Sequence, residues 1–152
     1  MSRVLTCMHA TKIGEGGPTR ILLIVKALVE APAGIALVAS PAMAVSLLTG
    51  QRFDEPAVGV LGRIAGVSLV ALGIACWLAH KQSQSRAAIG LTWALLFYDV
   101  SVVLIFLSAR FGMGIHGVAL WPAVALHSGL GIWSLLCLRN VMRVTSPGPF
   151  NQ

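Results

Sequence analysis

Four long apolar blocks, separated by short polar connectors, dominate this chain of 152 residues. They cover residues 21–49, 57–79, 87–109 and 115–138. A helix needs about 20 mainly apolar residues to cross the roughly 30 Å hydrocarbon core of a bilayer, and each block has that length. The pattern therefore predicts an all-α integral membrane domain over residues 21–138, built from four transmembrane helices.

The connectors between the blocks restrict how these helices can be arranged. They read QRFDEP, HKQSQSR and RFGMG, and each is short and either polar or glycine-containing. Short connections make successive helices neighbours that run in opposite directions, so we expect an antiparallel, up-and-down four-helix bundle. Only 11% of the residues are charged, against about 25% in an ordinary soluble domain.

The basic residues outside the blocks are distributed unevenly. Seven lie before the first block, in the middle connector or after the last block, and only two lie in the other two connectors: Arg3, Lys12, Arg20, Lys81, Arg86, Arg139 and Arg143 against Arg52 and Arg110. By the positive-inside rule, the segment 1–20, the middle connector and the tail 139–152 are expected in the cytoplasm. The net charge of +6 is thus a topology signal, and no basic groove with stacking aromatics indicates nucleic acid.

Ionisable residues inside the blocks are the candidate functional residues. Converted at 1.5 Å per residue, Asp99 lies roughly 15 Å below the outer surface, His127 roughly 18 Å below it, and Glu30 roughly 14 Å above the inner surface. Arg63 starts only about 9 Å from the outer surface, but its long side chain can turn inward. We therefore expect an intramembrane polar cluster of Glu30, Arg63, Asp99 and His127, since ionisable groups in a membrane usually face the bundle interior and have partners.

Lys26 and Glu30 are four residues apart on one helical face, so they can also form a local ion pair. The whole cluster has two interpretations. Polar side chains can simply hold membrane helices together, or they can titrate in function. The sequence leaves this choice open and identifies no catalytic residue.

Small residues indicate where the helices approach one another. Gly59, Gly62, Gly66 and Gly73 share one face of the second block and predict close helix packing there. In the first block, Pro32 and Pro41 each remove a backbone hydrogen bond, so this helix should bend at one or both positions.

Three cofactor motifs are incomplete. Gly112, Gly114 and Gly117 have dinucleotide-site spacing but lack the required strand and βαβ unit. The histidines do not pair at one depth as bis-histidine haem requires, which leaves haem bound through His127 alone as an alternative. Cys76, His80 and Cys137 lack the paired spacing of a metal site. No metal or other cofactor is predicted, with quinone, haem or metal kept as alternatives.

The first half of the chain resembles a known group of proteins. Gly34, Pro41 and LLTG ending at Gly50, followed by RIAG and Gly73, resemble the DoxX-like group of small four-helix bacterial membrane proteins. The second half, with LLFYD and LWPAVALH, looks like that of small bacterial inner-membrane proteins. The resemblance implies a multi-pass protein of the bacterial inner membrane, and some members of the group are associated with redox or quinone-linked complexes.

Two functions are compatible with these patterns. The first is a non-catalytic accessory subunit or assembly factor that contacts other membrane subunits, or a second copy of itself, within the lipid bilayer. The alternative is a small transporter or a redox, quinone-binding protein in which Glu30, Asp99 and His127 handle protons. Little of the chain lies outside the blocks, which favours the first.

Overall fold

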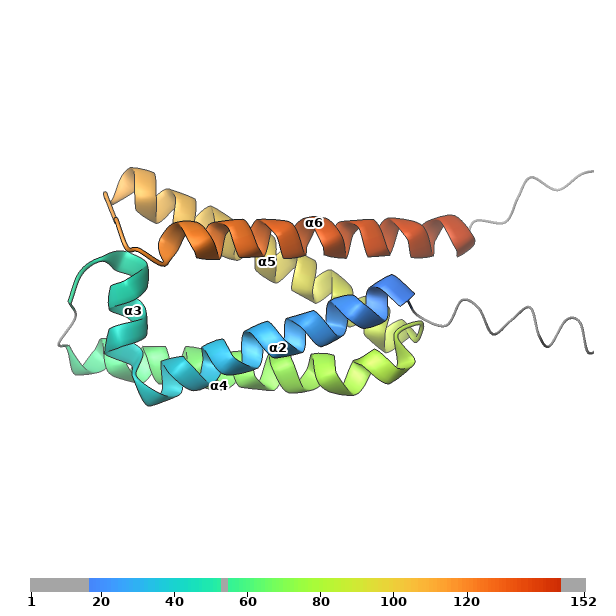
Figure 1. The fold of residues 1–152 in the computed structure, drawn as a ribbon, viewed down its shortest axis with the longest axis horizontal. Helices are drawn as coiled ribbons and strands as arrows, with labels where there is room; N and C mark the ends of the chain where they lie inside the picture. Colours follow the sequence, from blue (N-terminus) through green and yellow to red (C-terminus); the bar gives the residue numbers. More distant parts are fainter. Residues whose placement is uncertain (1–16, 53–54, 146–152) are drawn as a thin grey trace, which may run out of the picture.

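The computed structural model describes residues 17–52 and 55–145, and this part of the chain is helical without a strand (Figure 1). The helices are α2 (Gly17–Ala39), α3 (Pro41–Thr49), α4 (Pro56–Ala79), α5 (Arg86–Gly112) and α6 (Leu120–Thr145), with a short 3-10 turn, η1 (His80–Gln82), after α4. Four segments are long and apolar enough to cross a membrane: Gly17–Ala39, Pro56–Gln82, Arg86–Gly112 and Leu120–Arg143. This is the organisation of a multi-pass membrane protein.

The first apolar block forms two helices, so the expectation of one bent helix over residues 21–49 is wrong. The break is at Ser40, whose backbone is not helical (φ −143°, ψ 70°). A residue before proline is disfavoured in helical conformation, and Pro41 has no N–H to continue the hydrogen-bond ladder. Pro32, by contrast, stays inside α2.

The boundaries of the last helix also differ from expectation. Gly114 adopts a left-handed conformation (φ 67°), and the chain turns before α6 begins at Leu120 rather than at residue 115. At the other end α6 continues to Thr145, so it includes the start of the segment 139–152 that was expected to be a tail. The remainder of that tail and the segment 1–16 lie outside the described residues.

Helix α3 is held across one end of the molecule by the connection that leads into α6 (Figure 1). The Ala119 N–H donates to the Leu47 carbonyl at 2.9 Å, and the His116 N–H donates to the Thr49 carbonyl at 3.3 Å. Gly117 permits this contact, because a Cβ atom there would lie 2.1 Å from the Leu48 carbonyl carbon. The chain after Pro41 thus closes one end of the bundle.

Helix α4 packs on α2 through glycines. A Cβ atom on Gly34 would lie 2.6 Å from the Gly66 carbonyl oxygen, and one on Gly66 would lie 2.7 Å from the Gly34 carbonyl oxygen. Gly73 meets Ala31 in the same seam, and Gly62 meets Pro41 at the start of α3, whereas a Cβ atom on Gly59 would have no neighbour within 4 Å. Three of the four expected packing glycines therefore lie against another helix of the same chain.

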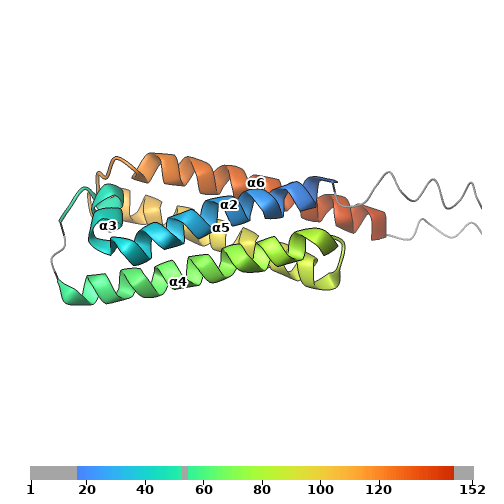
Figure 2. The same cartoon turned by 60° about the horizontal axis from the view of Figure 1, so that its bottom comes forward.

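The helices associate as two pairs, α2 with α4 and α5 with α6 (Figure 2). Helix α2 also joins the pairs through two apolar clusters. One contains Leu23 and Ala27 with residues of α4 and α5, and the other contains Leu22 with Leu130 and Cys137 of α6. The Lys26 and Glu30 side chains of α2 are buried on this inward-facing side of the helix as well.

Candidate functional site

Two charged residues of α2 are buried inside the bundle. Lys26 is 0% exposed and Glu30 is 1% exposed. They are four residues apart, which brings the Lys26 ammonium nitrogen within 3.4 Å of the Glu30 Oε1 atom. This is the local ion pair expected from the sequence spacing, but both partners are deprived of water.

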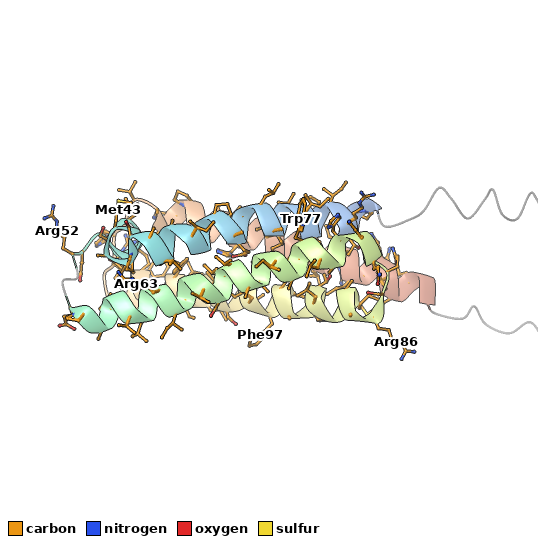
Figure 3. The ribbon with its side chains drawn as sticks, turned by 90° about the horizontal axis from the view of Figure 1, so that it is seen from below. Met43, Arg52, Arg63, Trp77, Arg86 and Phe97 are labelled. Atoms are coloured by element: carbon orange, nitrogen blue, oxygen red, sulfur yellow. The ribbon has the colours of Figure 1, made fainter. Side chains whose placement is uncertain are left out.

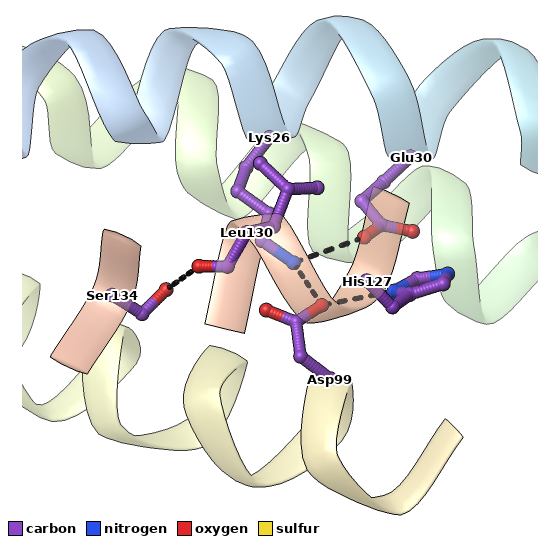
Figure 4. A network of polar contacts seen from close by, with 6 residues as sticks. All are labelled: Lys26, Glu30, Asp99, His127, Leu130 and Ser134. Atoms are coloured by element: carbon purple, nitrogen blue, oxygen red, sulfur yellow. Dashed lines mark hydrogen bonds and ion pairs between the residues drawn. The ribbon is translucent and has the colours of Figure 1, made fainter. Parts of the chain in front are cut away.

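Asp99 connects this pair to the other half of the molecule (Figure 4). It is the middle residue of the 27-residue helix α5 and is 1% exposed. Its Oδ1 atom lies 2.5 Å from the Lys26 Nζ atom and 2.9 Å from the His127 Nδ1 atom on α6. One carboxylate oxygen thus receives hydrogen bonds from two helices and joins the α2/α4 pair to the α5/α6 pair.

The second carboxylate oxygen of Asp99 is different. Among the described residues, Oδ2 is the buried side-chain polar atom that has no hydrogen-bond partner. It faces the region of Gly131, where a Cβ atom would lie 3.3 Å from the Asp99 Cβ atom and 4.0 Å from Oδ2. Asp99 and His127 also line a pocket of about 260 Å³ between α5 and α6. Asp99 therefore lines the pocket and keeps one buried carboxylate oxygen without a hydrogen-bond partner.

The charges of the cluster do not cancel unless it holds a proton. One ammonium and two carboxylates, Lys26 with Glu30 and Asp99, leave a single negative charge when His127 is neutral. A proton on the imidazole or on a carboxylate brings the sum to zero. A net charge within an apolar bundle is costly. Binding or losing one proton therefore changes the electrostatic energy of this site.

Tyr98 completes the surroundings of these groups. Its ring centroid lies 5.6 Å from the Lys26 Nζ atom, and its ring meets the His127 ring edge-on at 5.5 Å. Its hydroxyl also interacts with the Glu30 carboxylate. Tyr98 precedes Asp99 in the sequence, yet a tyrosine in an apolar block gives no signal that separates it from an ordinary packing residue.

The structure brings together Glu30, Asp99 and His127 from three helices, but it leaves out Arg63. That side chain is exposed on α4 and lies toward the α3 end of the molecule (Figure 3). The expectation that it pairs with Asp99 is wrong because the neighbouring glycines, not Arg63, face α2. Lys26 supplies the cation instead. From the sequence, Lys26 was expected to form an ion pair with Glu30 alone. Its position one turn before Glu30 could have indicated that it also belongs to the buried cluster.

The arrangement also bears on metal binding. Glu30, Asp99 and His127 offer ligand atoms that lie within 4.8 Å of one another. The Lys26 ammonium contacts both carboxylates, so this chain provides its own cation at that position. Cys76 and Cys137 belong to separate apolar clusters, and the His80 Nδ1 atom contacts the Trp77 carbonyl. The described residues thus do not assemble the alternative site of two cysteines and a histidine.

Comparisons with family models, with curated proteins and with solved structures found no match for this chain.

Proposed function

We propose that this chain is a small membrane transport or redox protein whose buried Lys26, Glu30, Asp99 and His127 side chains exchange protons while a lipophilic molecule is handled nearby. The observation that carries the proposal is the environment of Asp99. Its Oδ1 atom joins a lysine and a histidine, while its Oδ2 atom is unpartnered beside a pocket. The large majority of buried polar atoms are hydrogen-bonded, so the unpartnered Oδ2 atom favours a role beyond helix packing.

Energetics support a role beyond holding helices together. Polar contacts between membrane helices contribute only about 0.6 kcal/mol on average. Replacing a buried ion pair by apolar side chains of similar size is often neutral or stabilising. Four ionisable groups gathered at one place are therefore an expensive way to join helices, and ionisable residues in membrane spans usually mark proton or substrate pathways.

We further propose an antiparallel, up-and-down topology in the bacterial inner membrane, with both termini in the cytoplasm. The distribution of basic residues supports this orientation. The up-and-down topology is supported by the arrangement of the helices, because the start of α2, the connection after α4 and the end of α6 lie at one end of the molecule (Figures 1 and 2). Membership of the DoxX-like group stays a proposal that rests on the short motifs of the first half of the chain.

Proton movement across reconstituted vesicles tests the proposed function. Under an imposed pH gradient, with charge balanced by potassium and valinomycin, vesicles containing the natural chain should acidify faster than empty vesicles. Asp99→Asn and His127→Gln should each remove most of this excess rate. His116→Gln is the matched control, because His116 is exposed at the connection before α6 and outside the cluster. Equal rates for Asp99→Asn and the natural chain would refute the proposal.

An accessory subunit or assembly factor is the second candidate function. Apolar grooves flank the α2/α4 seam, one of them lined by Ile35, Val38 and Val67, and a partner helix would fit such a surface. However, Gly62, Gly66 and Gly73 already pack within the chain, so these small residues are not free for a partner. Recovery of a stoichiometric membrane partner from gently solubilised membranes, without proton movement by the isolated chain, would favour this second function.

A further inference from the structure

The pocket between α5 and α6 has an apolar wall and one polar corner. Leu96, Val103 and Leu135 are among its apolar residues. Asp99 and His127 form the polar corner, and Ser128 beside His127 also lines the pocket. Its volume of about 260 Å³ lies just below the range of about 300 to 1,000 Å³ that is usual for ligand pockets. The space therefore suits a compact molecule with a mainly apolar body.

The polar corner presents hydrogen-bond acceptors. Asp99 Oδ1 is occupied by Lys26 and His127, while Oδ2 is buried and has no partner. Since the His127 Nδ1 atom faces a carboxylate oxygen, it carries the hydrogen of that contact, which leaves Nε2 as an acceptor whenever the ring is neutral. A ligand that only accepts hydrogen bonds would meet Oδ2 without satisfying it, whereas a ligand hydroxyl would donate to it.

The mouth of the pocket opens on the outer surface of the helix pair. Val100, Leu104 and Ile132 line the pocket and are exposed on the sides of α5 and α6. In a membrane-spanning bundle these sides face hydrocarbon, so a ligand would enter from the lipid rather than from water. This route selects molecules that partition into the bilayer.

We propose that the α5/α6 pocket binds a lipophilic molecule carrying a hydroxyl group, which donates a hydrogen bond to Asp99 Oδ2. This inference names the class of ligand for the proposed function and shares Asp99 with it, but it rests on the unsatisfied oxygen and the pocket. Gly131 is a positioning residue here, because any side chain at this position would extend toward Asp99 and narrow the polar corner.

The test compares two probes of nearly the same shape, para-propylphenol and its methyl ether, para-propylanisole. Their binding to the full chain in lipid nanodiscs is measured by saturation-transfer NMR, with empty nanodiscs subtracted to remove partitioning. Because a hydrogen bond to a charged acceptor contributes about 1.5–3 kcal/mol, the phenol should bind at least about tenfold more tightly than the ether. Equal affinities would overturn the proposal.

The Asp99→Asn variant is expected to change the preference between the two probes, and not simply to abolish binding. Lys26 and His127 both donate to the position of Oδ1, so the asparagine oxygen should stay there and its amide NH₂ should take the position of Oδ2. The pocket would then present a donor, and the preference for the phenol over the ether should disappear or reverse. A preserved phenol preference in a folded Asp99→Asn protein would contradict the assignment of Oδ2.

Val103→Trp should fill the pocket and weaken both probes, whereas Val60→Trp, on an exposed part of α4, should not. Thermal unfolding of each variant verifies that it is folded. Unchanged probe binding to folded Val103→Trp would place the site elsewhere and overturn the inference. Proton movement without selective phenol binding refutes only this inference, while selective binding without proton movement refutes only the proposed function.

Discussion

Lys26 balances much of the negative charge in the middle of the bundle, because its ammonium contacts both Glu30 and Asp99. Lys26→Met keeps a long apolar side chain but leaves two carboxylates without their cation. Removing one partner of a buried ion pair typically costs about 3–5 kcal/mol, and we expect a loss of this size in the free energy of unfolding. Thermal and denaturant unfolding in detergent measure it.

The double variant Lys26→Met with Asp99→Asn is the control for this effect. Removing one negative charge together with the positive charge should restore part of the lost stability, so the two changes should not be additive. Additive losses would mean that the 2.5 Å contact between Lys26 and Asp99 contributes little to folding.

Residue by residue, depth along each helix predicts part of this site. Glu30, Asp99 and His127 have similar expected depths, and the structure places their ligand atoms within 4.8 Å of one another. Depth alone does not predict whether Lys26 or Arg63 pairs with Asp99. That outcome depends on how α2 and α4 are rotated about their axes. The unsatisfied Asp99 Oδ2 atom and the role of Tyr98 depend on side-chain packing and could not be predicted.

At the scale of the helices, glycines allow α2 and α4 to pack closely against each other. A Cβ atom on Gly66 would meet backbone atoms of α2, namely the Gly34 carbonyl oxygen at 2.7 Å and the Val38 nitrogen at 2.9 Å. Backbone cannot move aside as a flexible side chain can. We therefore expect Gly66→Ala to lower the free energy of unfolding by about 1–3 kcal/mol.

Gly59→Ala is the matched control. Gly59 lies in the same helix, but a Cβ atom added to it would have no neighbour within 4 Å. In the interior of a helix alanine is favoured over glycine, so this variant should be neutral or slightly stabilised. Unfolding experiments on the two variants under identical conditions compare them directly. The same stability for both would show that the seam tolerates a methyl group.

The break between α2 and α3 shows why helix boundaries were harder to predict than helix positions. Pro32 and Pro41 follow the same local rule, yet only Pro41 ends a helix. Distant contacts favour the break at Pro41, since α3 is held by hydrogen bonds to residues 116 and 119 and Pro41 packs against Gly62. Such contacts between distant parts of the sequence have no local signature.

For the whole molecule, orientation in the membrane is a separate prediction. Reporter fusions should place residue 1, the segment around Gln84 and residue 152 in the cytoplasm, because these regions contain seven of the nine basic residues outside the apolar blocks. Fusions near Arg52 and Met113 should report the opposite side. A reporter signal from the outer side at either terminus would overturn the orientation.

The overall architecture was predictable to different extents. Four helices of membrane-spanning length follow from hydropathy, because the bilayer imposes both their length and their composition. The arrangement as two pairs, α2 with α4 and α5 with α6, did not follow from short connectors, which suggest that every successive helix packs on the previous one. Gly66 and Gly73 of α4 pack against α2 within one pair, and Lys26 of α2 contacts Asp99 of the other pair.

The most direct test of the central claim is the protonation of the cluster itself. Solid-state NMR of the chain in lipid bilayers, with ¹⁵N-labelled histidine and ¹³C-labelled aspartate and glutamate, reports the protonation of His127, Asp99 and Glu30 separately. His127→Gln and Asp99→Asn provide the assignments. Over the range of buffer pH in which the chain stays folded, we predict that at least one of these groups gains a proton as the pH falls, because a group that exchanges protons must bind and release them. Signals from all three that stay constant over this range would contradict the central claim.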